Sequence, residues 1–131
     1  MNQSQYMKLI QAILAFAAAL FGIATIVAGV RVLSGSDPGY AVFRPLLIYN
    51  TAMGIAYIAA GILIWRSVDR GMYAAAIVFV LNFLMLGAIG SLYVLGSAVA
   101  VESFGAMSLR TVVWLVLYLL LKRMSRRSGT T

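Results

Sequence analysis

The sequence contains no cysteine and no histidine, and it has only three acidic residues. The absence of cysteine excludes disulfides and thiolate metal ligands. The absence of both residues excludes the common ligand sets for haem, copper, zinc and iron–sulfur clusters, so we expect no cofactor and no metal. No acidic residue lies within a long apolar run. Because these runs therefore lack the usual nucleophiles and general bases, the sequence predicts a protein that is not an enzyme.

Charge is also scarce in this sequence. Charged residues make up 10% of the 131 residues, and hydrophobic residues make up 63%. Soluble domains typically contain about 25% charged residues, so this composition indicates a membrane protein. The net charge of +7 would suggest nucleic acid as a partner of a soluble protein. Here the cations stand at the ends of apolar runs, where they meet lipid headgroups, and we expect membrane lipids and no nucleic acid as partners.

Four apolar runs are each long enough to cross a bilayer, which takes about 20 helical residues. The first run is longer than the apolar part of a signal peptide, so we expect it to be retained. Turn-forming residues in SGSDPGY separate the first two runs, and the short RSVDR link forces the second and third to pack antiparallel. The SAVAVESFG link is apolar enough to be partly helical. The sequence predicts one all-α domain, an antiparallel bundle of four transmembrane helices at about 9–31, 44–66, 71–97 and 104–122.

Basic residues are distributed unequally between the two ends of these spans. Positive residues are retained on the cytoplasmic side of a membrane, so the larger group marks that side. We therefore expect both termini in the cytoplasm, in an inner or plasma membrane of the bacterial type. The two groups are Lys8, Arg66, Arg70, Lys122, Arg123, Arg126 and Arg127 at the end with the termini, and Arg31, Arg44 and Arg110 toward the other end.

Small residues recur at helical spacing in the first two spans. Lipid is as apolar as leucine, so helices in a membrane associate through close packing of small residues and through a few hydrogen bonds. We expect the small-residue faces of the first and second spans to meet. The fourth span has no glycine between Met107 and Lys122, which is typical of a helix that faces lipid. The two faces consist of Ala15, Ala18, Ala19, Gly22, Thr25 and Gly29, and of Asn50, Gly54, Tyr57 and Gly61.

Several polar residues fall within the outer half of the predicted spans. Counting about 1.5 Å per residue from the cytoplasmic end places Arg110 and Asn82 at about 18 Å, in a core roughly 30 Å thick. The same count places Asn50 and Thr25 at about 24–25 Å. Placing a charged side chain at such a depth costs about 3 kcal/mol or more of free energy, so we expect Arg110 to have a structural or a functional role there. The residues predicted to form a polar pocket or an interhelical network are Arg110, Asn82, Asn50, Thr25, Tyr57 and Trp114.

Two interpretations of this polar group remain open. In the structural one, Arg110 extends to an acidic residue at the outer surface, and the asparagines bond helix to helix. In the functional one, the group forms an outward-facing pocket whose cation attracts an anion or a lipid headgroup. Trp114, one turn from Arg110, is either its cation–π partner or an ordinary packing residue. The candidate ion-pair residues at this surface are Glu102, Asp37, Arg31 and Arg44.

Two functions follow from these interpretations. The first is an accessory or assembly subunit that packs against a larger membrane complex or self-associates, because the sequence consists almost entirely of spans with short loops. The alternative is a small transporter, channel, or lipid- or anion-binding protein with a pocket around Arg110. A conducting path needs polar side chains across the full membrane thickness. The cytoplasmic half has only Tyr57 and Gln11, so a path through a single subunit is disfavoured.

Overall fold

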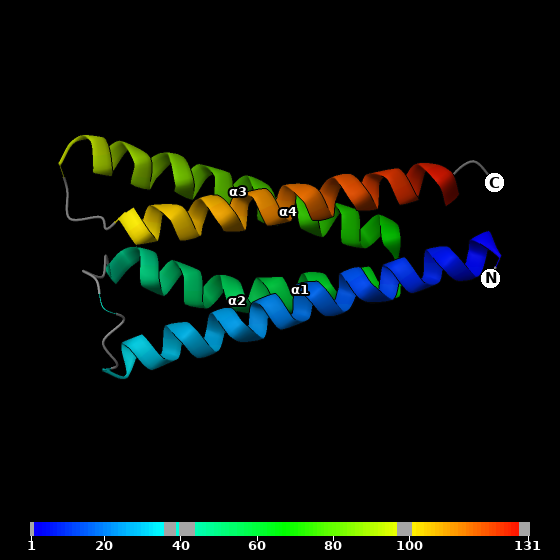
Figure 1. The fold of residues 1–131 in the computed structure, drawn as a ribbon, viewed down its shortest axis with the longest axis horizontal. Coiled ribbons are helices and arrows are strands. Elements are labelled where there is room, and N and C mark those ends of the chain that lie inside the picture. Colours follow the sequence, from blue (N-terminus) through cyan, green and yellow to red (C-terminus); the bar gives the residue numbers. More distant parts are fainter. Residues whose placement is uncertain (1, 36–38, 40–43, 97–100, 129–131) are drawn as a thin grey trace.

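The computed structural model describes residues 2–35, 39, 44–96 and 101–128. These residues form four helices, each long and apolar enough to span a membrane. Consecutive helices run antiparallel, and both termini lie at the same end of the bundle (Figure 1). The predicted fold class is confirmed: the chain is an all-α integral membrane protein with a four-helix bundle. The helices are α1 (Gln3–Leu33), α2 (Arg44–Arg66), α3 (Val68–Val94) and α4 (Val101–Ser128).

The helices at the two ends of the sequence are longer than their apolar runs. α1 starts at Gln3 because Asn2 and Gln5 form a capping box, in which each side chain accepts a hydrogen bond from the other residue's backbone N–H. α4 starts at Val101, so part of the SAVAVESFG link is helical, as expected. It continues to Ser128 through the basic segment after Lys122. An apolar run thus marks where a helix crosses lipid, while caps and local propensity decide where it ends.

A single residue, Ser67, connects α2 to α3. Its side chain caps α3 by accepting from the Arg70 backbone N–H at 3.4 Å. A Cβ atom at Gly71 would lie 2.6 Å from the Cα atom of Ile64, so only glycine fits where the two helices turn back on each other. The Ser125 hydroxyl donates to the Asp69 carboxylate and links α4 to the first turn of α3. The short link therefore holds its helices antiparallel, as predicted.

α1 and α2 make the most extensive helix contact in the bundle, and glycines lie along it. A Cβ atom at Gly22 would lie 2.6 Å from the Gly54 carbonyl oxygen, and one at Gly61 would lie 2.9 Å from the Ala15 carbonyl oxygen. The backbones of the two helices touch at these positions, which gives the van der Waals contact that holds helices together in lipid. The expected meeting of the two small-residue faces is confirmed. We call this contact the α1–α2 seam.

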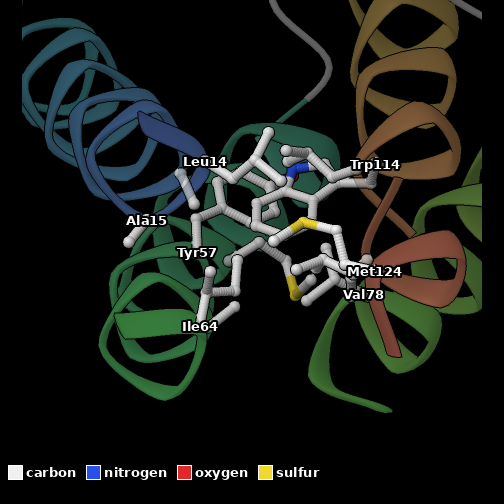
Figure 2. Close-up of a cluster of buried hydrophobic side chains, with 13 residues drawn as sticks. Leu14, Ala15, Tyr57, Ile64, Val78, Trp114 and Met124 are labelled. Atoms are coloured by element: carbon white, nitrogen blue, oxygen red, sulfur yellow. The ribbon is translucent and has the colours of Figure 1, made fainter. Parts of the chain in front are cut away.

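Large side chains fill the space between the α1/α2 pair and the α3/α4 pair. Leu14, Tyr57, Val78 and Trp114 come from the four different helices and converge in one core cluster (Figure 2). The Tyr57 and Trp114 side chains are fully buried. α4 contributes further residues to this core, so it faces lipid only on its opposite side, where it exposes Leu109, Val112, Val116 and Leu119.

Candidate functional site

Asn82 is the polar centre of the space between the helix pairs. Its side chain is fully buried on α3. Its Oδ1 atom accepts hydrogen bonds from the Tyr49 hydroxyl at 3.1 Å and from the Tyr57 hydroxyl at 3.2 Å, both on α2. Its Nδ2 atom is buried and has no hydrogen-bond partner among the described residues. Asn82 therefore bonds α3 to α2 through its oxygen and leaves its amide donors unused.

The Trp114 ring stacks on the Tyr57 ring, with 5.0 Å between ring centroids and 26° between planes. Phe21 of α1 packs edge-on against both rings. The part of the chain that the structure describes shows no cation–π contact between Trp114 and Arg110; the one it contains joins Lys122 to the Tyr118 ring. Trp114 thus packs with aromatic rings, while its buried Nε1–H lacks a partner among the described residues.

Thr25, Asn50 and Arg110 line one cavity, at the end of the bundle away from the termini. Its volume is about 100 Å³. This exceeds the roughly 10–15 Å³ that one water needs and is well below the roughly 300–1,000 Å³ of typical ligand pockets. The cavity therefore has room for one small polar group. Its walls are Thr25, Ala28, Gly29 and Val32 of α1, Leu47 and Asn50 of α2, and Ser103, Ala106 and Arg110 of α4.

Two wall residues of this cavity have unpaired polar atoms. The Arg110 Nε–H, a donor, and the Asn50 Oδ1 atom, an acceptor, are buried and have no hydrogen-bond partner within the described part of the chain. The Thr25 hydroxyl donates to the Phe21 carbonyl oxygen at 2.7 Å, which leaves the hydroxyl oxygen free to accept. Asn50 directly follows Tyr49 on α2, and the Tyr49 hydroxyl donates to Asn82. The cavity and the Asn82 cluster are therefore neighbours.

The acidic residues expected near Arg110 do not pair with it in the described structure. Glu102 is exposed, and it lies about 12 Å from Arg110 along the axis of the same helix, which is too far for an ion pair. Arg31 and Arg44 are also exposed, and neither forms an ion pair with a described residue. Asp37 lies outside the described residues. Within the described ranges, the guanidinium of Arg110 thus has no acidic counter-ion.

Two residues of the site, Tyr49 and Ser103, are absent from the set predicted from the sequence. Tyr49 stands about two turns before Tyr57 and so lies on the same face of α2, a spacing that could have indicated it. Ser103 was expected near the start of the fourth span, whereas α4 begins before it and places it against the cavity. Its exposed fraction is 9%.

No family model, curated protein or solved structure matches this chain. In the ranges that the structure describes, no group of three or more His, Cys, Asp or Glu residues is placed to hold a metal ion. The chemistry of the site therefore follows from the polar atoms of Arg110, Asn50 and Asn82 and from the size of the cavity beside them.

Proposed function

We propose that this protein binds an oxyanion group, a phosphate or a carboxylate, in the cavity around Arg110. The observation that carries the proposal is the buried Arg110 Nε–H, which faces no acidic partner among the described residues. A guanidinium presents several donors in a planar fork that matches the oxygens of phosphate and carboxylate. A bound anion would neutralise the charge that makes Arg110 expensive at this depth.

The other wall residues restrict the ligand further. Asn50 has an unpaired acceptor atom, and Thr25 has a hydroxyl oxygen that can accept. A group that both accepts from Arg110 and donates to these oxygens satisfies all three, so the proposed ligand is an oxyanion with a neighbouring hydroxyl. Two sources provide this chemistry: a phospholipid headgroup such as phosphoglycerol, and a soluble hydroxylated anion such as glycerol 3-phosphate.

The position of the cavity favours entry from the lipid. α1 and α4 make far less contact with each other than either makes with its sequence neighbour. Both helices contribute walls to the cavity. With a volume of about 100 Å³, the cavity takes one group, so the remainder of a larger ligand would lie outside it, between α1 and α4. A lipid has this shape, with a small polar group joined to an apolar remainder.

The proposed orientation puts the cavity in the outer leaflet. Seven of the ten basic residues lie at the end with the termini, and positive residues mark the cytoplasmic side. The absence of cysteine makes this testable by labelling single introduced cysteines with a membrane-impermeant maleimide. In intact cells we expect Ser34→Cys to react and Ser4→Cys to react only after permeabilisation. The reverse pattern would contradict the orientation.

An accessory or assembly role, with the chain packed against a larger complex or against its own copies, stays a prediction. Exposed apolar side chains on all four helices are compatible with it, but they are equally compatible with plain lipid contact. The unpaired groups in the cavity favour ligand binding instead. We therefore place the binding function first, as a non-enzymatic one.

The binding proposal is tested with the full chain purified in a neutral detergent. Native mass spectrometry with added phosphatidylglycerol or phosphatidylcholine measures lipid binding, and calorimetry with glycerol 3-phosphate or inorganic phosphate measures binding of soluble anions. We expect Arg110→Gln to weaken binding of the anionic ligand about 10- to 100-fold, as the loss of hydrogen bonds to a charged group predicts. Arg31→Gln, which changes an exposed arginine at the same end, is the matched control.

The two arms distinguish the sources of the ligand. If Arg110→Gln weakens binding of phosphatidylglycerol and the wild type does not bind the soluble anions, the ligand is a lipid headgroup. If Arg110→Gln weakens binding of glycerol 3-phosphate, the ligand is a soluble anion. Equal binding by wild type, Arg110→Gln and Arg31→Gln in both arms would overturn the proposal.

A further inference from the structure

A second hollow lies at the opposite end of the bundle, near the termini, on the outer surface of α1 and α2. It is a groove of about 260 Å³. Its walls include Phe16 and Trp65, whose exposed rings meet edge-on with centroids 6.0 Å apart. We call it the Trp65 groove. Its lining residues, all apolar, are Ala15, Phe16, Ala19, Gly61, Ile62 and Trp65.

The α1–α2 seam explains why this groove exists. A Cβ atom at Gly61 would lie within about 3 Å of the backbones of Ala15 and Ala19, so the two helices touch where their side chains are smallest. The small residues at this contact form the floor of the groove, and the larger Phe16, Ile62 and Trp65 side chains lie around it. Gln11 fixes the cytoplasmic end of the seam, because its Nε2 atom donates to the carbonyl oxygens of Ile64 at 2.7 Å and Trp65 at 3.2 Å.

A second, more polar hollow lies next to the groove. Trp65 also lines a neighbouring hollow together with Lys8, Gln11 and Ala12. Lys8 is exposed, and Arg66, next to Trp65 in the sequence, is exposed as well. Lys8 and Ala19 are about 16 Å apart along α1, so the two hollows extend over roughly half of the hydrocarbon core. The exposed cation Lys8 thus lies beside the apolar groove, on the side of the termini.

We propose that the Trp65 groove binds one acyl chain of an anionic phospholipid whose headgroup phosphate contacts Lys8. Charge complementarity identifies the headgroup, because basic pockets between helices at the cytoplasmic surface bind anionic headgroups. The lining of the groove identifies the acyl chain, because all the residues that form it are apolar. Tryptophan is also enriched at the depth where headgroups meet acyl chains.

This site is independent of the Arg110 cavity, so one titration can separate them. The full chain in neutral detergent is titrated with phosphatidylglycerol and phosphatidylcholine, and bound lipids are counted by native mass spectrometry. We expect Lys8→Gln to weaken one phosphatidylglycerol site about 5-fold, as about 1 kcal/mol per cation near an anionic headgroup predicts. Trp65→Ala, which removes a wall of the groove, should weaken the same site by at least as much. Arg110→Gln should leave this site unchanged.

Arg70→Gln is the matched control, because Arg70 is exposed at the same end of the bundle and lines neither hollow of this site. We expect it to change the affinity less than 2-fold, and unchanged melting temperatures would exclude misfolding in each variant. Three results would overturn the proposal: equal losses for Lys8→Gln and Arg70→Gln, equal binding of both lipids by the wild type, or a dimer whose contact is abolished by Trp65→Ala.

Discussion

The α1–α2 seam and the space between the two helix pairs are built in opposite ways. In the seam, glycines bring backbones together, so that even a methyl group at Gly22 would lie 2.6 Å from the facing Gly54 carbonyl oxygen. Between the pairs, the helices are held apart by the stacked rings of Tyr57 and Trp114 and by the buried amide of Asn82. The first region is closely packed. The second contains polar atoms and borders a cavity.

The two regions also differ in where unpaired buried polar atoms lie. Within the described residues they belong to Asn50, Asn82, Arg110 and Trp114, which come from α2, α3 and α4 and lie between the pairs or around the cavity. Unsatisfied buried groups destabilise a protein, so a fold that concentrates them in one place has a use for them there. The close packing of the seam thus suits a role in stability, and the unpaired atoms between the pairs support the proposed ligand binding there.

Enlarging a glycine in the seam should have the largest effect on stability. Gly22→Leu would force a side chain against the Gly54 carbonyl oxygen and the Ile58 backbone. Overpacking of this kind costs about 1–3 kcal/mol, and more where backbone must move, so we expect a large fall in melting temperature or a failure to fold. Thermal unfolding in detergent measures it.

The control for this change is Gly87→Ala on α3. A Cβ atom at Gly87 would meet nothing within 4 Å. Because alanine is the better helix former, we expect this variant to be as stable as the wild type or up to about 1 kcal/mol more stable. Equal effects of Gly22→Leu and Gly87→Ala would show that the seam is not the main source of stability.

Removing the amide between the pairs should have an intermediate effect. Asn82→Leu deletes the acceptor of two tyrosine hydroxyls and leaves the fully buried Tyr57 hydroxyl unpaired. A buried group without a partner costs about 1–3 kcal/mol, and we expect a loss in that range in the free energy of unfolding. The double variant Asn82→Leu with Tyr57→Phe should recover part of the loss. No recovery would indicate that Asn82 acts through packing alone.

A smaller effect is expected from the polar contact at the end of the seam. Gln11→Leu removes the donor to the Ile64 and Trp65 carbonyl oxygens. A hydrogen bond of this kind contributes about 0.5–1.5 kcal/mol, so the variant should lose less stability than Gly22→Leu. Unfolding of both variants in the same detergent makes the comparison. A larger loss for Gln11→Leu would mean that hydrogen bonds, and not close packing, hold the seam.

The sequence predicted the fold and the seam because each depends on a pattern within one helix. Apolar runs of spanning length indicate the number of helices, and Gly22, Gly54 and Gly61 recur on single faces. The ends of the helices were predicted less well. The start of α1 depends on the capping box of Asn2 and Gln5, which lies outside the apolar run.

The site was predicted only in its composition. Depth counting put Arg110, Asn50 and Thr25 in the outer half of the hydrocarbon core, and the structure places all three around one cavity. Which of them bond to each other depends on how the helices are rotated about their axes, and one sequence carries no information about that rotation. The stacking of Trp114 on Tyr57 and the paired tyrosine donors of Asn82 therefore became visible only in three dimensions.

The most direct test of the central claim is the stability of Arg110→Leu, measured by thermal unfolding in neutral detergent with and without phosphatidylglycerol or glycerol 3-phosphate. Removing a charge that lies within the membrane core without a partner is neutral or stabilising. We therefore expect the variant without ligand to be at least as stable as the wild type. Glycerol 3-phosphate should raise the melting temperature of the wild type alone, and phosphatidylglycerol should raise that of the wild type more than that of the variant, because the variant keeps the Trp65 groove. A loss of about 3–5 kcal/mol without ligand, as when a buried ion pair is broken, would show instead that Arg110 has an internal partner and a purely structural role.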